Sequence, residues 1–503
     1  MCIPKLRHGQ EVPLRIASPA DQEGIAVLVA LIALTMFSLL GLYMVFTSTT
    51  DVKISDNYES ELQARFAAQA GLSHARELME GMAFNDLLQG PDGTYDSSPG
   101  YMSQARTFGF RNLVSWTTAR SLNILDPTND VSTIPDDGLI NTGKYGATSG
   151  TVLIPLTGIA QTAPNPYGAG TITTSRYFFK VTDNNGEATE LAGDPSDNPF
   201  VDGDGIVIGR SVGVAQTIRE TAGATIRRNS VAVFEVRFKQ RSTFNLDSPL
   251  VVEGDAVLPS ASNMFDGNSF GIQGGSQVGL ATIDVNTANS VYPSQQVSSQ
   301  LAPNQTDNIS GAGLEPSIMD ITGSVSANED KALLLSKEYL YNFVNSVVPQ
   351  FADSSYSGNQ SWSGGSAPDI GYFDPSLPAN APGQRPRVTY VNGDLSVSGD
   401  MEGGGLLVVT GKFTSSGRFT YNGLVLVVGT GDMDAGGLNR GVYGGVYITS
   451  VTNSGGVISW GTPKLSMSGN SDIIINSNAI GMAMRLIPAS QTAFREITSA
   501  MDP

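Results

Sequence analysis

Length, composition and charge exclude several kinds of protein before any motif is considered. The chain has 503 residues, 57 of them glycine, and a formal net charge of −18. At this length two to four domains are expected, and 40% hydrophobic residues suffice to build their cores. The acidic balance argues against a nucleic-acid-binding surface, which needs a basic footprint. Only 15% of the residues are charged, and the abundant Gly, Ser, Thr and Asn predict β-rich extracytoplasmic domains with many turns.

The rarest residues exclude further chemistry. The chain has one cysteine, Cys2, and two histidines, His8 and His74. A single cysteine cannot close an intramolecular disulfide, and a Cys/His zinc site cannot be assembled within one chain. A Ser-His-Asp triad would have to use one of two histidines from the amino-terminal region, which nearly excludes that mechanism.

An uncharged hydrophobic segment covers residues 24–46. About 20 helical residues span the apolar core of a bilayer, so this segment is long enough to cross it. Lys5, Arg7 and Arg15 precede the segment, and the next basic residue is Lys53. The positive-inside rule therefore predicts a single-pass protein with a cytoplasmic amino terminus and with the residues beyond about 47 outside.

The helical pattern continues beyond the membrane segment. No proline interrupts residues 24–81, and Gly81 is a suitable stop after Glu80. One helix of roughly 55 residues is unusual for a cleaved secretory signal, which has a shorter apolar core, and for a simple membrane anchor. The apolar positions that recur after the membrane segment include Val52, Leu62, Phe66, Ala70 and Leu78.

A run of small residues in this helix carries a family resemblance. Residues 64–72 read ARFAAQAGL, which is similar to the AFxAAEAGL pattern of PilX-type minor pilins of type IV pili. Small residues allow helices to pack closely against one another. The alternative is that they face the protein's own globular domain. The resemblance implies an assembly helix that includes Val29, Phe66, Ala67, Ala70, Gly71 and Leu72.

The resemblance also implies processing and partners. In the family a prepilin peptidase cuts after a glycine on the cytoplasmic side of the apolar helix, here Gly24, so the mature chain would begin at a methylated Ile25. The expected partners are this peptidase, other pilins and minor pilins, the inner-membrane assembly platform and the lipid bilayer, with no nucleic acid. The resemblance implies a place in the inner membrane with the bulk of the chain in the periplasm, and after assembly the protein would lie in a pilus or at the cell surface.

One position departs from the family pattern. Most pilins carry a glutamate at the fifth mature position, which helps an incoming subunit to dock, and this chain has Val29 there. A carboxylate in lipid is costly and is kept mainly for function. Its absence implies a subunit that does not repeat along the fibre, such as one at the tip.

The residues after the helix predict an antiparallel sheet. Runs of β-branched and aromatic residues occupy 177–181, 206–208 and 231–238. A long helix followed by a sheet that buries its apolar stripe is the pilin plan.

Glycine-punctuated acidic turns between those strands are a candidate calcium site. Hard cations need several oxygen ligands at close range, and Asp/Asn loops supply them. The spacing does not match the EF-hand template, and Asx-rich turns explain the same composition without a metal. No other cofactor is expected. The candidate ligands are Asp183, Asn185, Asp194, Asp197, Asp202 and Asp204.

The carboxy-terminal half predicts one soluble helix and then a repeat. Residues 329–350 read as an amphipathic helix, and residues 352–386, rich in Ser, Gly and Pro, read as a linker. Further on, NGDLSVSG aligns with TGKFTSSG at an offset of 18 residues, which places Leu406 over Leu424. A regular period of strands and turns predicts a β-solenoid-like domain, and a β-sandwich of two similar hairpins is the alternative.

The repeat also offers acidic residues, which bear on whether the chain is an enzyme. Glycan cleavage requires paired carboxylates at a defined separation, and the acidic residues of the repeat are predicted to lie at turns that backbone geometry explains. We therefore expect no enzymatic activity. These residues are Asp394, Asp400, Glu402, Asp432 and Asp434.

The predicted fold class is α+β and β-rich, and the predicted function is structural. The chain would be a minor pilin-like subunit that takes part in type IV pilus assembly or initiation. The alternatives are a minor pseudopilin of a type II secretion system and, from another class, a membrane-anchored adhesin or glycan-binding protein. The predicted parts are a prepilin leader (1–24), a long helix (25–81, transmembrane over 25–46), a pilin-like β domain (82–244), an intermediate domain (245–351), a linker (352–386) and a β-solenoid-like domain (387–503).

Overall fold

The fold was analysed in a computed structural model. The chain divides into two compact units, Met1–Gln63 and Ala64–Pro503, and each is described by itself. The first holds the greater part of a long helix. The second holds the end of that helix, an antiparallel sheet and a body of parallel strands. The structure describes residues 19–79, 84, 159–164, 171–184, 202, 205–221, 224–240, 242–286, 288, 292–377, 381–436 and 441–498.

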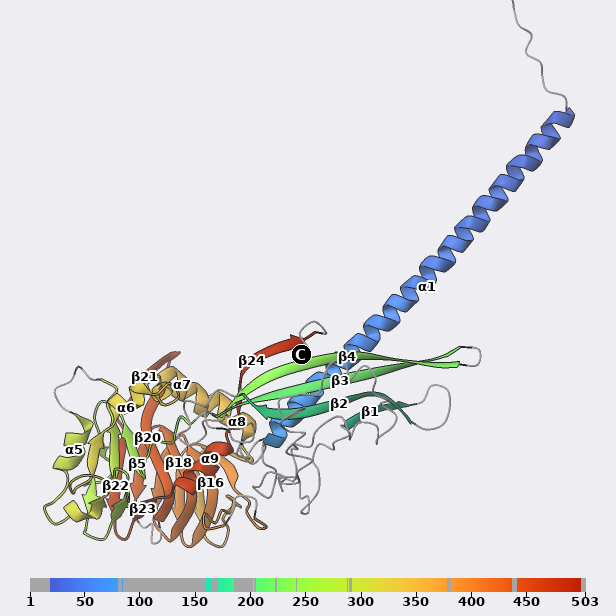
Figure 1. Cartoon of the computed structure of the whole chain (residues 1–503). Coiled ribbons are helices and arrows are strands. Elements are labelled where there is room, and N and C mark those ends of the chain that lie inside the picture. The colour runs from blue at the N-terminus through green and yellow to red at the C-terminus, as the bar shows by residue number, and fades with distance from the viewer. Residues whose placement is uncertain are drawn as a thin grey trace, which may run out of the picture. The chain divides into compact units, whose positions relative to one another are not determined.

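Helix α1 runs from Pro19 to Met79 without interruption (Figure 1). This confirms the long apolar amino-terminal helix that the sequence predicts. Because no proline follows Pro19 within it, every later backbone N–H is available to the helical hydrogen-bond ladder. The first 18 residues of the predicted leader and the predicted stop at Gly81 lie outside the described residues.

A five-stranded antiparallel sheet follows the helix, with the strand order β1-β2-β3-β4-β24. The three predicted runs at 177–181, 206–208 and 231–238 lie in β2, β3 and β4. The fifth strand, β24, comes from the carboxy-terminal end of the chain and was not predicted. The strands are β1 (Ile159–Pro164), β2 (Thr171–Asp183), β3 (Ile206–Thr221), β4 (Ala224–Lys239) and β24 (Ser490–Ile497).

The last four turns of α1 pack on this sheet through small side chains. At Gly213 of β3, an added Cβ would collide with the carbonyl oxygen of Ala64 and would lie 2.5 Å from the amide nitrogen of Ala68. The helix backbone therefore lies directly on the strand. The core around this crossing consists of Ala64, Ala68, Leu72, Ala75, Met79, Phe84, Val181, Val207, Ala215, Ala232, Phe234, Val236 and Phe238.

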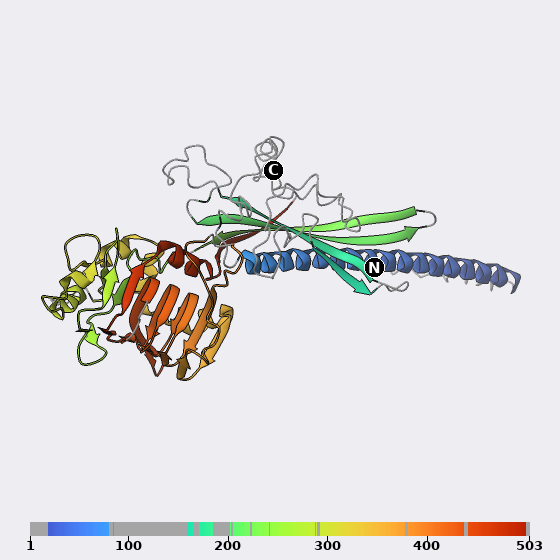
Figure 2. The ribbon, with the colours of Figure 1, turned by 90° about the horizontal axis from the view of Figure 1, so that it is seen from below.

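The body of parallel strands contains a large sheet, and adjacent strands along the main path of this sheet are parallel (Figure 2). Leu406 pairs with Leu424 and Leu407 with Val425, which is the predicted 18-residue offset. Hairpin strands are antiparallel, so this register excludes the two hairpins considered as the alternative. The central strands are β14 (Arg387–Asn392), β16 (Met401–Val409), β18 (Phe419–Gly429) and β20 (Gly441–Ser454).

A second parallel sheet alternates with the first along the chain. Its strands are β13 (Gln360–Ser363), β15 (Leu395–Ser398), β17 (Lys412–Ser415), β19 (Asp432–Ala435), β22 (Lys464–Ser468), β6 (Leu258–Pro259) and β7 (Phe265–Asp266). Leu407 of the first sheet and Phe413 of the second belong to one apolar cluster, whereas Leu406 belongs to another with helical residues. Both faces of the first sheet are therefore buried, which explains its unbroken apolar runs.

Shorter elements complete this body. They are β5 (Leu250–Glu253), β8 (Gly271–Gln273), β9 (Leu280–Ile283), α5 (Pro293–Ser299), η1 (Thr306–Asn308), β10 (Ile309–Ser310), β11 (Ile318–Asp320), α6 (Thr322–Ala327), β12 (Ser354–Ser357), β21 (Val457–Trp460), β23 (Asp472–Ile475) and α9 (Ser477–Arg485).

The parallel sheets cross the boundaries that the sequence suggested. β5 and β8, from the predicted intermediate domain, pair with β20 and β23 of the carboxy-terminal repeat. β12 and β13 lie within the predicted linker, where they pair with β14 and β15. The 18-residue period does not reveal these pairings, because the paired strands lie at other and larger separations along the chain, such as Ser354 with Thr389 and Leu250 with Val446.

The predicted helix over residues 329–350 is wrong as one continuous element. Ser336 divides it, because its side chain accepts a hydrogen bond from the amide of Tyr339 and so starts a new helix. The apolar face is nevertheless buried at Leu334, Val344 and Val348. The observed elements are the 3₁₀ turn η2 (Lys331–Leu335), α7 (Lys337–Asn342), the π-helical turn η3 (Phe343–Val347) and α8 (Val348–Phe351).

One carboxyl group is fully buried between strands of this body. Glu253 of β5 is 0% exposed and accepts a hydrogen bond from the hydroxyl of Tyr447 on β20, while its Oε1 has no partner. Removal from water raises the pKa of the Glu253 carboxyl to about 8, although the Tyr447 hydrogen bond acts in the opposite direction. Burial therefore favours the neutral form of the Glu253 carboxyl.

The close approach of helix and strand predicts a strong effect of a single methyl group. Gly213→Ala should destabilise the sheet by about 1–3 kcal/mol, because the new Cβ meets helix backbone that cannot move aside. Gly323→Ala, in α6, is the matched control because nothing lies within 4 Å of its new Cβ. Denaturant unfolding of both variants measures the difference, and equal midpoints would contradict the packing described.

The buried carboxyl predicts a pH-dependent stability. The folded-state pKa of Glu253 lies above the ordinary value of 4.5. The contribution of this carboxyl group to the free energy of unfolding is therefore fully present below about pH 4.5, and it is lost as the pH rises through about 8. Glu253→Gln, which stays neutral, should remove this part of the decline, so that the Tm falls less between pH 5 and 9 than in the wild type. Glu402→Gln, at an exposed site on β16, is the control, and identical profiles for Glu253→Gln and the wild type would refute the assignment.

Candidate functional site

The first part of α1 presents an apolar surface on all sides. Ile25, Val29 and Phe37 are 61%, 58% and 75% exposed, and no charged residue occurs from Ile25 to Thr50. Among the described residues one helix is long and apolar enough to cross a membrane, with a mean hydropathy of 2.7 in its most apolar window. A soluble helix exposes no such band, because its apolar residues form one stripe.

The threonine hydroxyl groups of this segment form hydrogen bonds within the helix itself. Thr35 donates to the carbonyl oxygen of Ile32 at 2.8 Å, and Thr47 donates to that of Tyr43 at 2.9 Å. Thr50 donates to the carbonyl oxygen of Phe46 at 2.8 Å. Such back-bonding satisfies the threonine donors without water, which suits a hydrocarbon surrounding.

The predicted processing site lies inside the helix. Gly24 and Ile25 belong to α1, which begins at Pro19. Val29 lies just over one turn beyond Ile25, on the fully apolar part of the helix. The structure places these three residues together on one element.

The predicted run of small residues at 64–72, the small-residue stripe, has a buried part and an exposed part. Ala67 is 0% exposed, Gly71 and Leu72 are buried, and Ala70 is half-buried. Phe66, by contrast, is 63% exposed. The buried members support the alternative that small residues face the protein's own domain, and Phe66 is the member left available to another molecule.

The partners of this stripe were missed from the sequence. An added Cβ at Gly71 would collide with the hydroxyl of Ser211 and lie 2.8 Å from the ring of Tyr177. The Tyr177 hydroxyl and His74 Nδ1 are 2.9 Å apart, so His74 ties helix to sheet. The signal available was the pair of glycines at 209 and 213 in an otherwise strand-like run, since glycine within a strand marks close backbone approach.

The candidate calcium ligands are only partly within the described residues. Asn185, Asp194, Asp197 and Asp204 lie outside them, and the backbone of Asp183 ends β2. The Asp202 carboxylate accepts hydrogen bonds from the amides of Gly205 and Ile206, at 2.9 and 3.1 Å. That is an Asx turn, the alternative considered from the sequence. Within the described ranges no three His, Cys, Asp or Glu side chains form a group that could hold a metal.

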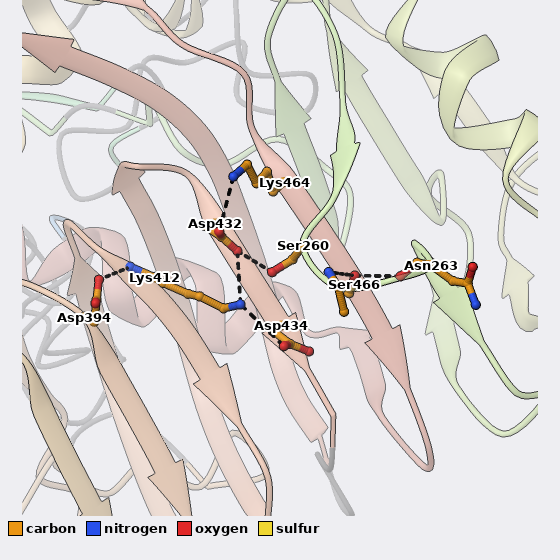
Figure 3. Close-up of polar contacts among 9 residues, drawn as sticks. Ser260, Asn263, Asp394, Lys412, Asp432, Asp434, Lys464 and Ser466 are labelled. Carbon is orange, nitrogen blue, oxygen red and sulfur yellow. Dashed lines mark hydrogen bonds and ion pairs between the residues drawn. The ribbon is translucent and has the colours of Figure 1, made fainter.

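The acidic residues of the repeat are paired with lysines. Asp432 and Asp434 were predicted at turns but lie on strand β19 (Figure 3). Lys412 Nζ lies 3.8 Å from Asp432 and 3.5 Å from Asp434, and Lys464 Nζ lies 4.0 Å from Asp432. Asp394 accepts the backbone amide of Lys412 at 2.8 Å. These contacts hold adjacent parallel strands in register.

The comparisons agree with the geometry of the helix. Residues 23–73 match the family described as PilX N-terminal, a segment that covers the apolar surface and most of the small-residue stripe. No curated protein and no solved structure matches the chain. The matched residues are the apolar part of α1 and the part of α1 that packs on the antiparallel sheet, so this amino-terminal segment is similar to that of PilX-type pilins of type IV pili.

Proposed function

We propose that the chain is a structural minor pilin-like subunit that takes part in type IV pilus assembly or initiation and catalyses no reaction. The observation that carries the proposal is the coincidence of the PilX N-terminal match with the exposed apolar helix. In this proposal a prepilin peptidase cuts after Gly24, and the mature helix leaves the inner membrane to join other pilins.

The position of Val29 supports a single place in the fibre rather than a repeating one. It is the fifth residue after the proposed cut, and it lies 58% exposed on the apolar part of α1. A subunit without a carboxylate there has no partner for the amino terminus of a neighbour, so its placement at the tip follows. The remaining apolar residues still supply the contact area that a helix bundle needs.

The parallel body supports a role in binding outside the membrane. We infer that it is a β-solenoid-like module, since its strands pair in parallel at an 18-residue offset around a common core. In the repeat the carboxylates of Asp432 and Asp434 contact lysines, which favours a structural role for them over catalysis of glycan cleavage. A module carried at the end of a pilus would then present its surface to what the pilus touches.

The mature amino terminus tests the proposal. In cells with prepilin peptidase the protein should begin at a methylated Ile25, and in cells lacking the peptidase residues 1–24 should remain. Mass spectrometry of the purified protein distinguishes the two forms. Gly24→Val should leave the precursor uncut even with the peptidase, because the branched side chain replaces the glycine at the cut. Ile54→Val, farther along α1, is the control.

Three outcomes would contradict it. An intact leader in the presence of the peptidase would favour a membrane-anchored adhesin or glycan-binding protein. Cleavage that is independent of the peptidase and falls beyond Phe46 would indicate a secreted protein. Co-purification with secretion-system components instead of pilus components would favour the pseudopilin alternative.

A further inference from the structure

The parallel body is an insertion into the antiparallel sheet. The chain leaves that sheet at Lys239, the last residue of β4, and returns at Ser490, the first residue of β24. These two residues are register partners. The strand order places β24 along the outer edge of β4. The last strand of the chain therefore completes a sheet that the first half of the chain began.

Apolar burial contributes little to holding β24. Its residues 491–495 are exposed, including Phe494 at 59%, and only Ile497 is deeply buried, at 2% exposed. The ladder with β4 also shifts register between Gln491 and Ala493. The ring of Phe494 lies 5.1 Å from that of Phe234 on β4, measured between the centroids. Because so little of its surface is buried, the strand depends mainly on its hydrogen bonds and on its charged contacts.

Two adjacent side chains of β24 supply those charged contacts, one to the sheet and one to the helix. Arg495 donates from Nε to Glu235 Oε1 on β4 at 2.7 Å, and its Nη2 lies 2.5 Å from the same oxygen. Glu496 Oε1 lies 3.2 Å from Nη2 of Arg65 on α1. The strand thus connects the edge of the sheet with the helix beneath it.

The contact at Glu235 is shielded from water on its inner side. The Glu235 carboxylate also accepts Nη2 of Arg210 at 2.9 Å, and these two side chains are 9% and 8% exposed, whereas Arg495 is 59% exposed. Charge-assisted hydrogen bonds of this kind are stronger than neutral ones. Loss of Arg495 would leave the inner Arg210–Glu235 pair intact. It would therefore weaken the contact between β24 and β4 and leave the rest of the sheet unchanged.

Without β24, the outer backbone groups of β4 would form an open edge. β4 is 16 residues long, and an uncovered strand of that length is a template for pairing with another chain. The edge can be covered in cis only after the whole inserted body has been made and its two ends have come together.

We propose that β24 is a carboxy-terminal latch, which closes the pilin-like sheet only in a chain whose inserted body is complete and folded. A chain with an unfinished body keeps the β4 edge open and cannot present the closed sheet. The latch acts through Arg495 and Glu496, and it lets the sheet close only after the chain has returned from the parallel body. This inference does not depend on which assembly the protein joins.

Hydrogen exchange of the full-length protein in detergent tests the latch. In Arg495→Ala/Glu496→Ala, amides of β24 and of the outer edge of β4 should exchange at least tenfold faster than in the wild type. Amides of β14, β16 and β18 should be unchanged. Arg418→Ala is the matched control, because it removes an exposed ion pair, 3.5 Å from Asp400, within the parallel body. It should leave β24 and β4 as they are.

A peptide with the sequence of residues 490–497 provides a second measurement. Fluorescently labelled, it should bind the double variant, whose β4 edge opens, and should not bind the wild type, whose edge is occupied. Unchanged exchange at β24 and β4 in the double variant would overturn the proposal. Equally faster exchange throughout the parallel body would also overturn it, because β24 would then be part of one cooperative unit rather than a latch.

Discussion

The close contact between the end of α1 and strand β3 is the constraint on which the pilin-like part depends. Gly213 lets the helix backbone rest on the strand, and Gly71 leaves room for Ser211 and Tyr177 on the facing side. Dense packing of this kind transmits small displacements, because interiors do not compress. The helix is consequently fixed to the sheet at one end, while its apolar portion remains exposed for a different environment.

Much of helix α1 and of the antiparallel sheet could be predicted from the sequence, because both follow from local patterns. The uncharged run and the absence of proline determine α1. Alternation and β-branched residues indicate β2, β3 and β4. The period of 18 residues predicted the register between Leu406 and Leu424. Local regularity was sufficient in each of these places.

The remaining features depend on contacts between distant residues, which a single sequence does not display. β24 is polar and irregular, and it is a strand because β4 offers an open edge and Glu235 offers a partner to Arg495. Helix 329–350 breaks because the Ser336 side chain competes for a backbone amide. In the candidate site, the exposure of Phe66 and the burial of Ala67 depend on which side the sheet covers.

The pairing of β5 with β20 has a consequence for how the protein reaches its folded state. Leu250 lies beside Val446, and Gly271 beside Asp472, so strands from the start of the body stack on strands from its end. Such a topology has a high contact order, and chains of high contact order fold slowly because distant segments must meet before their contacts form. β5 and β8 pair with β9 and β10, which lie near them in the chain, but their partners β20 and β23 become available only when the end of the chain is present. The net charge of −18 opposes association of such incompletely paired chains during that interval, because like charges repel one another.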